Sequence, residues 1–311
     1  MNTLKEAADE YVALRRSLGF KMIEVDYSLR RFVRFMDERN AAYVTTDLAL
    51  EWAQQPVGVL PAQWAARLSA VRGFARHRSL VDARTQIPPT NLFRFRTKRI
   101  QPYLYSREEI DKILNASLRL RCHSDFRRWT FHCFFGLLRV TGLRFSEAHN
   151  LTIDDVDVDS GVLRIRNTKF GKSRLVPIHP STANVIRRYL KRRSEYCKGR
   201  RCSPYIFVSR TGGQVPKTYI RETFRKLLKD IGLGAAQGAR APRMHDFRHL
   251  FAMETLIGWH RSGQDAEQRL PILAAFLGHV RYQSTYWYLS NAPGLMQQAV
   301  RRLERRWEDR T

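Results

Sequence analysis

Acidic residues are scarce in this sequence compared with basic ones. The 311-residue chain has 29 Asp and Glu residues against 55 Lys and Arg residues, which gives a formal net charge of +26. Solubility does not require so large an excess, and charge of one sign on this scale indicates a polyanionic partner, most economically nucleic acid. Hydrophobic residues make up 43% of the chain, so we expect sizeable cores, and the length suits about two domains.

Long hydrophobic runs are also missing. No apolar stretch approaches the roughly 20 residues that a membrane-spanning helix needs, so a membrane is a poorer candidate for the polyanion than DNA. The N-terminal residues Met-Asn-Thr-Leu-Lys-Glu lack the apolar segment of a signal peptide. We therefore expect a cytoplasmic protein that is associated with the nucleoid and has no membrane partner.

Cysteine is rare and irregularly placed. Cys122, Cys133, Cys197 and Cys202 form neither a C-x2-C pair nor a regular spacing, which favours reduced intracellular thiols. Cys-His and His-Cys dipeptides at 122–123 and 132–133 suggest zinc, but they lie ten residues apart around a predicted buried helix. Structural zinc ligands are usually spaced more tightly, so we expect no metal site.

Residues 1–97 are predicted to form a compact helical domain. Apolar residues in this part of the chain repeat at helical spacing in four segments. The segments are Leu4, Tyr11, Leu14 and Leu18, ended by Gly19; Leu29, Phe32, Val33 and Met36; the short helix Asp47 to Gln55; and Trp64, Leu68, Val71 and Phe74.

The other face of the fourth helix carries basic residues, of which Arg78 is one. More basic residues follow Pro88 and Pro89 in a connector. An extended cationic linker, placed at 98–105, can track a phosphate backbone while it joins two domains. The residues expected to bind DNA are Arg67, Arg72, Arg76, Arg94, Arg96, Lys98 and Arg99.

The second domain, 106–311, is predicted to be α+β. Ser106-Arg-Glu-Glu109 resembles a capping box that opens a helix, and an apolar helix follows from about Asp125 to Val140. Alternating patterns over 153–158, 162–165 and 173–178 predict three short strands, the first two joined by Asp159-Ser-Gly161. Lys169 lies in a turn between the second and third strands. The fold class is therefore mainly α with a small antiparallel β-sheet.

Two stretches of this domain carry residues that suit attack on a phosphodiester. In Thr141-Gly142-Leu143-Arg144-Phe-Ser146-Glu147, Gly142 permits a tight turn and Glu147 lies where its carboxylate can orient Arg144. The second stretch is Met244–Ser290, in which His245 and Arg248 share one helical face. Gly278 is a candidate helix stop that leaves His279 free at the helix end.

These motifs, in this order, resemble the tyrosine recombinases of the phage-integrase and Xer family. The matching elements are Thr-Gly-Leu-Arg144-x-Ser-Glu147, the hairpin Lys169 ahead of Arg-Leu-Val-Pro, His245-x-x-Arg248-His249, Leu-Gly-His279, and a tyrosine nine residues after that histidine. They cover about 106–290. The N-terminal part is similar to the family's helical (SAM-like) core-binding domain only in size, helicity and charge.

The resemblance implies a site-specific recombinase or integrase that cuts and rejoins DNA through a covalent 3′-phosphotyrosine, without metal, ATP or another cofactor. It implies that Tyr288 is the nucleophile and that the phosphate is surrounded by Arg144, Arg248, Lys169, His245 and His279. Lys169 would protonate the leaving 5′-oxygen, His245 would assist proton movement at the tyrosine, and Glu147 would orient.

Some features depart from the family pattern or leave alternatives open. Phe247 replaces an aliphatic residue, the segment from Gly258 to Glu267 is long enough to be a lineage-specific loop, and Tyr282 and Tyr286 compete with Tyr288 as nucleophile. A type IB topoisomerase-like enzyme and an inactive DNA-binding regulator on the same fold remain alternatives. The recombination site, the phage, transposon or chromosomal origin and any partner recombinase stay open.

The tail is predicted to form an exchange helix at 293–308. Met296, Val300, Leu303 and Trp307 are spaced by four, three and four residues, which gives an apolar stripe on a helix. In the family such a helix often docks into a neighbouring protomer, so the resemblance implies a homotetramer on double-stranded DNA sites. Packing of the stripe onto its own domain is the alternative.

Overall fold

The computed structural model describes residues 3–93, 101–122, 124–166, 173–234 and 241–279, together with Thr285, Tyr286 and Tyr288. The chain divides into two compact units, Met1–Ile100 and Gln101–Thr311. Each unit has a hydrophobic core of its own, and the two are described separately. Among the described residues, no helix is both long enough and apolar enough to cross a membrane.

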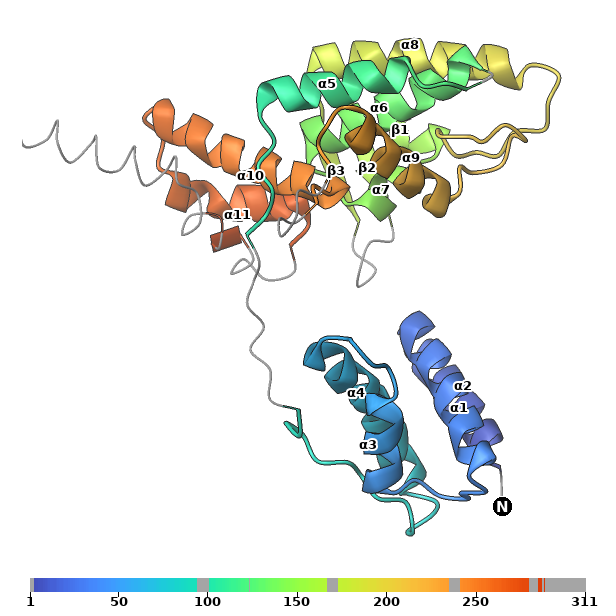
Figure 1. The fold of residues 1–311 in the computed structure, drawn as a ribbon. Helices are drawn as coiled ribbons and strands as arrows, with labels where there is room; N and C mark the ends of the chain where they lie inside the picture. The colour runs from blue at the N-terminus through green and yellow to red at the C-terminus, as the bar shows by residue number, and fades with distance from the viewer. Residues whose placement is uncertain are drawn as a thin grey trace, which may run out of the picture. The chain divides into compact units, whose positions relative to one another are not determined.

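The described part of the N-terminal unit is helical (Figure 1). Its helices are α1 (Leu4–Ser17), α2 (Ile23–Glu38), α3 (Thr46–Gln54) and α4 (Pro61–Arg78). Thr3 and Glu6 form a capping box at the start of α1, and Pro61 occupies the first turn of α4, so both helices begin where their sequences favour a start. Phe32, Trp52 and Phe74 are almost fully buried between the helices.

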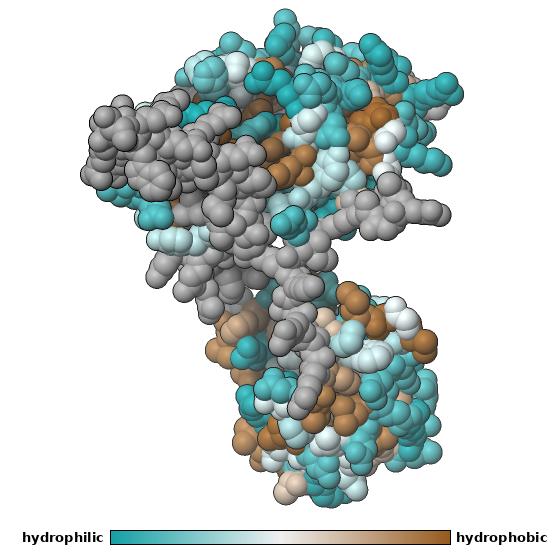
Figure 2. All heavy atoms as spheres, turned by 60° about the vertical axis from the view of Figure 1, so that its left-hand side comes forward, coloured by the Kyte–Doolittle hydropathy of each residue, from teal (hydrophilic) through white to brown (hydrophobic). Residues whose placement is uncertain are grey.

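The apolar stripe predicted for α1 is only partly correct. The helix buries Leu4, Ala7, Ala8 and Val12, whereas Leu14 and Leu18 are 47% and 62% exposed. Small residues satisfy the same helical period and allow α1 to approach α2 and α4 closely, and Leu18 already lies beyond the helix end. Figure 2 shows apolar patches on the surface of this unit.

Arginines of α4 have partners within the N-terminal unit. Arg67 stacks on the Trp52 ring and donates to the Trp52 carbonyl oxygen. Arg72 donates to the carbonyl oxygens of Pro88 and Pro89, which fastens the end of the unit to α4. Arg78 is buried beside Asp82, while Arg76 remains exposed. The basic face therefore also holds the unit together.

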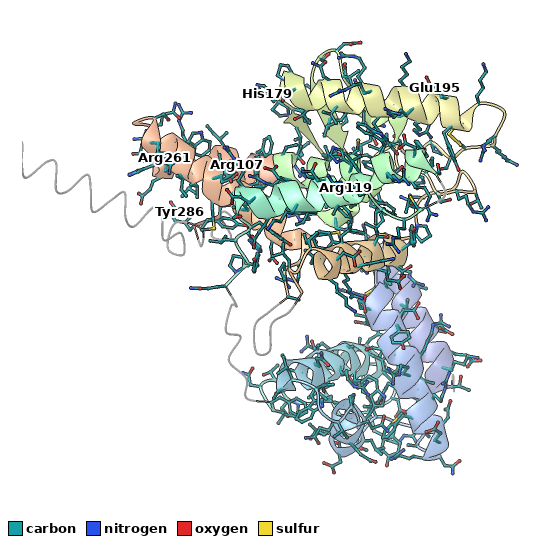
Figure 3. The ribbon with its side chains drawn as sticks, turned by 45° about the horizontal axis from the view of Figure 1, so that its top comes forward. Arg107, Arg119, His179, Glu195, Arg261 and Tyr286 are labelled. Carbon is teal, nitrogen blue, oxygen red and sulfur yellow. A yellow bond between two sulfur atoms is a disulfide. The ribbon has the colours of Figure 1, made fainter. Side chains whose placement is uncertain are left out.

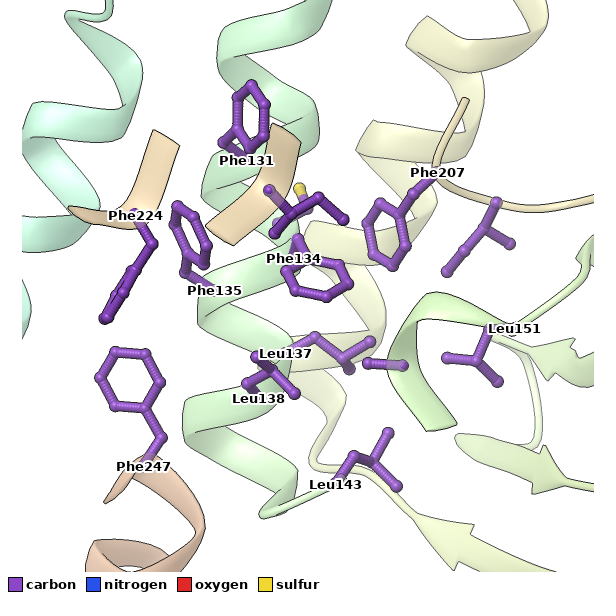
Figure 4. Close-up of a cluster of buried hydrophobic side chains, with 14 of the residues drawn as sticks. Phe131, Phe134, Phe135, Leu137, Leu138, Leu143, Leu151, Phe207, Phe224 and Phe247 are labelled. Atoms are coloured by element: carbon purple, nitrogen blue, oxygen red, sulfur yellow. The ribbon is translucent and has the colours of Figure 1, made fainter. Parts of the chain in front are cut away.

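The C-terminal unit is built around a central helix. Its helices are α5 (Arg107–Leu118), α6 (Asp125–Thr141), α7 (Phe145–His149), α8 (Pro180–Cys197), α9 (Lys217–Asp230), α10 (Met244–Arg261) and α11 (Ala266–Leu277). Helix α6 contacts α5, α7, α8 and α10 (Figure 1). Its phenylalanines, with Phe207, Phe224 and Phe247 from other segments, fill the main core (Figure 4).

Figure 3 gives the extent of two of these helices. Arg107 and Arg119 mark the two ends of α5, and His179 and Glu195 lie near the two ends of α8. The capping box predicted at Ser106 and Glu109 opens α5. Phe247, the departure from the family pattern, is 1% exposed and packs against Tyr105 and Phe224, so it replaces an aliphatic side chain within the core.

A three-stranded antiparallel sheet in the order β1-β2-β3 lies beside these helices. Its strands are β1 (Val156–Asp157), β2 (Val162–Ile165) and β3 (Arg174–Pro177), with Leu163 opposite both Val156 and Val176. The first strand is shorter than predicted, because Ile153–Asp155 forms a 3-10 helix in which the Asp155 carboxylate accepts from Thr152. The predicted turn that carries Lys169 lies outside the described residues.

Cys197 and Cys202 form a disulfide, so the prediction of reduced thiols is wrong for this pair. The chain turns back immediately after α8, so the Cα atoms of Cys197 and Cys202 lie 5.8 Å apart, a distance that a disulfide can span. No sequence motif predicts this bridge. Cys122 and Cys133 are free, and burial raises the pKa of the Cys133 thiol to about 12. The described residues contain no cluster of three or more His, Cys, Asp or Glu that could hold a metal ion.

The segment from Gly258 to Glu267, considered as an inserted loop, is mostly helical. Helix α10 runs to Arg261, and α11 begins at Ala266 with Asp265 as its N-cap. The helices α10 and α11 pack against each other and form a small separate core with Leu256, Leu270 and Tyr288 (Figure 1). Of the predicted catalytic residues, His245 and Arg248 lie on α10, and His279 and Tyr288 follow α11.

Candidate active site

Arg248 is fixed deep in the C-terminal unit. It lies in the second turn of α10 and is 2% exposed. Its Nη1 donates to the Gly142 carbonyl oxygen at 2.8 Å, and its Nη2 donates to the Leu277 carbonyl oxygen at 2.7 Å. Burial and the nearby Arg144 guanidinium lower the pKa of Arg248 to about 10, so Arg248 stays cationic at neutral pH.

The Glu147 carboxylate binds the Arg144 guanidinium, as the spacing of the two residues predicts. Arg144 is the N-cap of α7, and its Nη1 donates to Glu147 Oε1 at 2.7 Å. Its Nη2 donates to the Gly278 carbonyl oxygen at 2.7 Å. Gly142 and Gly278 both end helices with a positive φ, which confirms the tight turn predicted at Gly142 and the helix stop predicted at Gly278. The carbonyl oxygens of both glycines bind guanidinium groups of the site.

Arg174 belongs to the same network, although its sequence pattern gives no sign of this. From β3, its Nη1 and Nη2 donate to the two oxygens of Glu147 at 3.0 and 2.9 Å, and its Nε donates to the Phe276 carbonyl oxygen at 2.7 Å. Burial by itself raises the pKa of Glu147, but the bonds from Arg174 and Arg144 outweigh it and leave that pKa below its usual value.

The three arginines share one helix end. Three successive carbonyl oxygens at the C-terminus of α11 each accept from a different guanidinium: Phe276 from Arg174, Leu277 from Arg248, and Gly278 from Arg144. A helix C-terminus leaves carbonyl groups without helical partners and carries partial negative charge. The end of α11 therefore positions three cations side by side.

His245 lies in the first turn of α10, as predicted. Its ring keeps an exposed surface, but packing around it and the guanidinium groups of Arg248, Arg243 and Arg144 lower its pKa to about 4. The imidazole is therefore neutral at physiological pH. Those neighbours place His245 beside the cationic groups of the site.

His279 follows Gly278 and is not free as predicted. Its Nδ1 lies 2.7 Å from Thr285 Oγ1, and its ring stacks on the Tyr288 ring at 6.4 Å between centroids. Thr285 is fully buried, so this contact connects the end of α11 to the segment that carries the tyrosine. Thr285 is a second site residue that the sequence does not identify.

Tyr288 is buried in the protein interior, whereas Tyr286 is exposed to solvent. Tyr288 is 2% exposed and packs in the core of the α10–α11 hairpin, whereas Tyr286 is 47% exposed (Figure 3). The Tyr288 hydroxyl lies 2.9 Å from Nδ1 of His249. His249 was part of the motif, but its spacing alone assigns it no role. Tyr282, the other competing tyrosine, lies outside the described residues.

Other predicted site residues are also outside the described part of the chain. They are Lys169, Arg94, Arg96, Lys98, Arg99 and the tail residues Met296, Val300, Leu303 and Trp307. The structure thus brings together Arg144, Glu147, His245, Arg248, His279 and Tyr288 from α7, α10, α11 and the segment after α11.

The arrangement can bind and activate a phosphodiester. A guanidinium has five N–H donors, and the intramolecular bonds described above use two on Arg144 and two on Arg248. Donors thus remain for the non-bridging oxygens of a phosphate, where guanidinium groups stabilise developing charge. A phenol held next to them by two helices is a suitable nucleophile.

Comparison with known proteins agrees with this site. The phage integrase family matches residues 105–294 of the chain. The integrase/recombinase homologue y4rB of Sinorhizobium fredii is 50% identical over 314 residues and covers 100% of both chains. The tyrosine recombinase XerD of Caulobacter vibrioides is 30% identical over 234 residues, which are 74% of this chain and 71% of XerD.

Solved structures share the fold at lower identity. The Tn1549 transposon integrase in complex with circular intermediate DNA superposes with a TM-score of 0.64 at 18% identity, over 96% of this chain and 99% of that one. The XerH site-specific recombinase bound to difH substrate gives a TM-score of 0.60 at 19% identity, over 88% and 77%. With its family match, its full-length relative and its fold, the chain belongs to the phage integrase family and is a tyrosine-type DNA recombinase.

Proposed function

We propose that this recombinase cuts and rejoins DNA at specific sites through a covalent 3′-phosphotyrosine at Tyr288, and that it needs neither a metal ion nor ATP. The observation that carries the proposal is the convergence of two fixed guanidinium groups, Arg144 and Arg248, with a buried tyrosine whose ring stacks on His279. DNA substrates are supported by the DNA-bound structures of the Tn1549 integrase and XerH.

In the proposed reaction, the Tyr288 oxygen attacks the scissile phosphorus in line with the departing 5′-oxygen. Charge develops on the non-bridging oxygens, and the guanidinium groups of Arg144 and Arg248 neutralise it. Lys169 protonates the 5′-oxygen as it leaves. The phosphotyrosyl ester conserves the energy of the broken phosphodiester, so a new DNA 5′-hydroxyl can attack it and restore the strand without ATP.

Glu147 orients one of these cations. Its side chain is 4% exposed and carries bonds from both Arg144 and Arg174, so it acts through the guanidinium groups and does not touch the phosphate. His245 is neutral and lies beside Arg144 and Arg248, which suits a hydrogen bond to a phosphate oxygen. His279 adds a second imidazole at the same helix end.

For the whole chain, we propose that residues 1–97 form a DNA-clamping domain joined by the linker 98–105 to the catalytic domain 106–311. Arg76, exposed on α4, is the described residue best suited to contact the phosphate backbone. The lambda integrase tetramer on a Holliday junction supports tetrameric assembly for a protein of this fold. Such an assembly would bring two recombination sites together.

The experiment is a covalent-adduct assay with a nicked duplex that traps the cleaved state. The substrate must contain the chain's own site, which can be selected from random duplexes by binding. Wild-type protein is expected to give a protein–DNA adduct that survives denaturing electrophoresis, also in EDTA. Tyr288→Phe should bind the duplex but give no adduct.

Tyr286→Phe is the matched control, since Tyr286 is exposed and lies two residues away. It should form adduct like the wild type. An adduct that persists in Tyr288→Phe and disappears in Tyr286→Phe would assign the nucleophile to Tyr286 instead. Relaxation of supercoiled DNA without strand exchange between two sites would identify a topoisomerase-like activity.

A further inference from the structure

His249 contacts the hydroxyl of the proposed nucleophile. Its Nδ1 lies 2.9 Å from the Tyr288 hydroxyl oxygen, and the two ring centroids are 5.5 Å apart. Tyr288 is 2% exposed, so its hydroxyl depends on protein groups for hydrogen bonding. Attack on phosphorus requires this hydroxyl to lose its proton, and a group within 2.6–3.2 Å satisfies the geometric requirement for a general base.

Helix α10 presents two histidines to two different parts of the site. His245 and His249 are four residues apart and share one helical face, and their rings meet edge to face at 4.8 Å between centroids. Burial and the charges of Arg248, Arg243 and Arg144 lower the pKa of His245, so this imidazole lies close to the arginines of the site. His249 contacts the tyrosine hydroxyl. Helix α10 thus carries one imidazole near the arginines and one in contact with the tyrosine.

The environment of His249 suits proton acceptance. Among the described residues, the titratable or charged groups around the contact are His245 and Arg248 on α10, His279 after α11, and Tyr288 itself. Arg248 is fixed by two carbonyl groups, and its charge interacts favourably with an ionised Tyr288. A cation held there stabilises the phenolate character that develops as the proton leaves.

We propose that His249 is a catalytic residue that accepts the Tyr288 proton during cleavage and returns it during ligation. In cleavage, the Tyr288 Oη–P bond forms and the P–O5′ bond breaks, while the phenolic proton moves to Nδ1 of His249 and makes the ring an imidazolium. The 5′-oxygen receives its proton from the acid on the leaving-group side. Ligation reverses each step, and no further reactant is needed.

This inference rests on the proposed function and adds an acceptor for the Tyr288 proton to it. The resemblance assigned assistance at the tyrosine to His245, whereas the contact belongs to His249. To accept the Tyr288 proton, the neutral His249 ring must have its lone pair on Nδ1 and its hydrogen on Nε2. A side chain that accepts a hydrogen bond but is not basic would keep Tyr288 in place without taking up the proton.

The test compares His249→Asn with wild type in single-turnover cleavage of the nicked duplex. The Asn amide oxygen can occupy a position near that of Nδ1, so the fold and DNA affinity should be kept. Cleavage should slow by about 100-fold or more, the usual contribution of a general base. In wild type the rate should rise with pH and then level off, whereas in His249→Asn it should keep rising toward ionisation of the phenol.

Two chemical substitutions separate a base from a merely structural residue. A fluorinated tyrosine at position 288, whose phenol is more acidic, should restore most of the rate in His249→Asn at neutral pH. A substrate with sulfur at the 5′-bridging position, whose leaving group needs no proton, should rescue Lys169→Ala but not His249→Asn. His260→Asn is the control, with the same replacement on α10 about 16 Å further along the helix.

The outcomes distinguish this inference from the proposed function. If wild type forms the adduct and Tyr288→Phe does not, but His249→Asn cleaves at the wild-type rate with the wild-type pH profile, the role of His249 is overturned and Tyr288 remains the nucleophile. A slow His249→Asn that the acidic phenol fails to rescue likewise leaves His249 only a structural role. If wild type forms no adduct at all, the proposed function fails, and the inference fails with it.

Discussion

Arg174 and Glu147 are separated by 27 residues in the sequence and joined by two hydrogen bonds of 3.0 and 2.9 Å. Their side chains are 13% and 4% exposed, so the pair is largely removed from water. The pair links β3 to α7, and through Glu147 it connects to Arg144, one of the two guanidinium groups proposed to bind the phosphate.

Arg174→Ala should lower the free energy of unfolding by about 3 kcal/mol, because it leaves the buried Glu147 carboxylate with one guanidinium in place of two. Urea denaturation measures the change. Arg187→Ala removes an exposed pair with Asp159 and should cost less than about 1 kcal/mol. Equal effects of the two substitutions would show that burial does not strengthen the Glu147 contact.

Gly278→Ala should impair both folding and cleavage. Its φ is +68°, and a Cβ there would lie 2.7 Å from Arg174 Nη1, so the guanidinium would be displaced from Glu147 and Phe276. Gly263 has a φ of +77°, and a Cβ added there would have no other atom within 4 Å. Gly263→Ala should therefore cost only backbone strain of about 1 kcal/mol. Thermal melting and adduct assays on both variants check this, and unimpaired cleavage by Gly278→Ala would contradict it.

His245 should titrate near pH 4 in the free protein, well below the usual 6.5. Because the folded-state pKa is lowered, the unfolded chain binds the proton first, and stability contributed by neutral His245 is lost as pH falls from about 6.5 toward 4. NMR titration of the imidazole, assigned with His245→Asn, measures the pKa. Binding of a duplex should raise it, because a phosphate offsets the charge of Arg144 and Arg248; a pKa unchanged by DNA would place His245 away from the phosphate.

Cys197→Ser should destabilise the oxidised protein by about 2 kcal/mol, the value expected for opening so short a loop. The mechanism is loss of a constraint on the unfolded chain, so dithiothreitol should remove the difference from wild type. Cys122→Ser, which removes a free thiol, should behave like wild type under both conditions. Thiol titration of unreduced protein should find two reactive groups after unfolding; four would contradict the disulfide.

Truncation after Asn291 should leave a protein that binds single sites but does not assemble two sites into one complex. The prediction rests on the apolar stripe from Met296 to Trp307, since a tryptophan in such a stripe is a typical interface anchor. Light scattering and native gels on DNA measure assembly. Trp307→Ala should reproduce the defect in the full chain, whereas normal tetramer formation by the truncated chain would indicate that the stripe packs on its own domain.

Local spacing predicted the parts of the site that depend on neighbours in sequence. Arg144 and Glu147 are three residues apart at the start of α7, and the positive φ at Gly142 and Gly278 follows from helix ends that only glycine fits well. Each of these features involves residues within one or two turns of each other.

Most of the features that the sequence did not predict depend on contacts between residues far apart in the chain. Arg174 is separated from Phe276 by 102 residues, and a strand pattern gives no information about a helix end that it will meet. The bond from His249 to Tyr288 spans 39 residues, and the bridge from Cys197 to Cys202 depends on how the chain turns after α8. In α1, alanines satisfied the helical period as well as the exposed leucines did.

The shared helix end has one more consequence. Since Phe276, Leu277 and Gly278 each bind a different arginine, a single local opening of α11 releases β3, α10 and α7 contacts together. Losses at two of these arginines should therefore be less than additive, because the first loss already weakens the helix end to which the second arginine is bound. Amide hydrogen exchange around the three arginines should follow one common opening free energy, so the site assembles or comes apart as one cooperative unit.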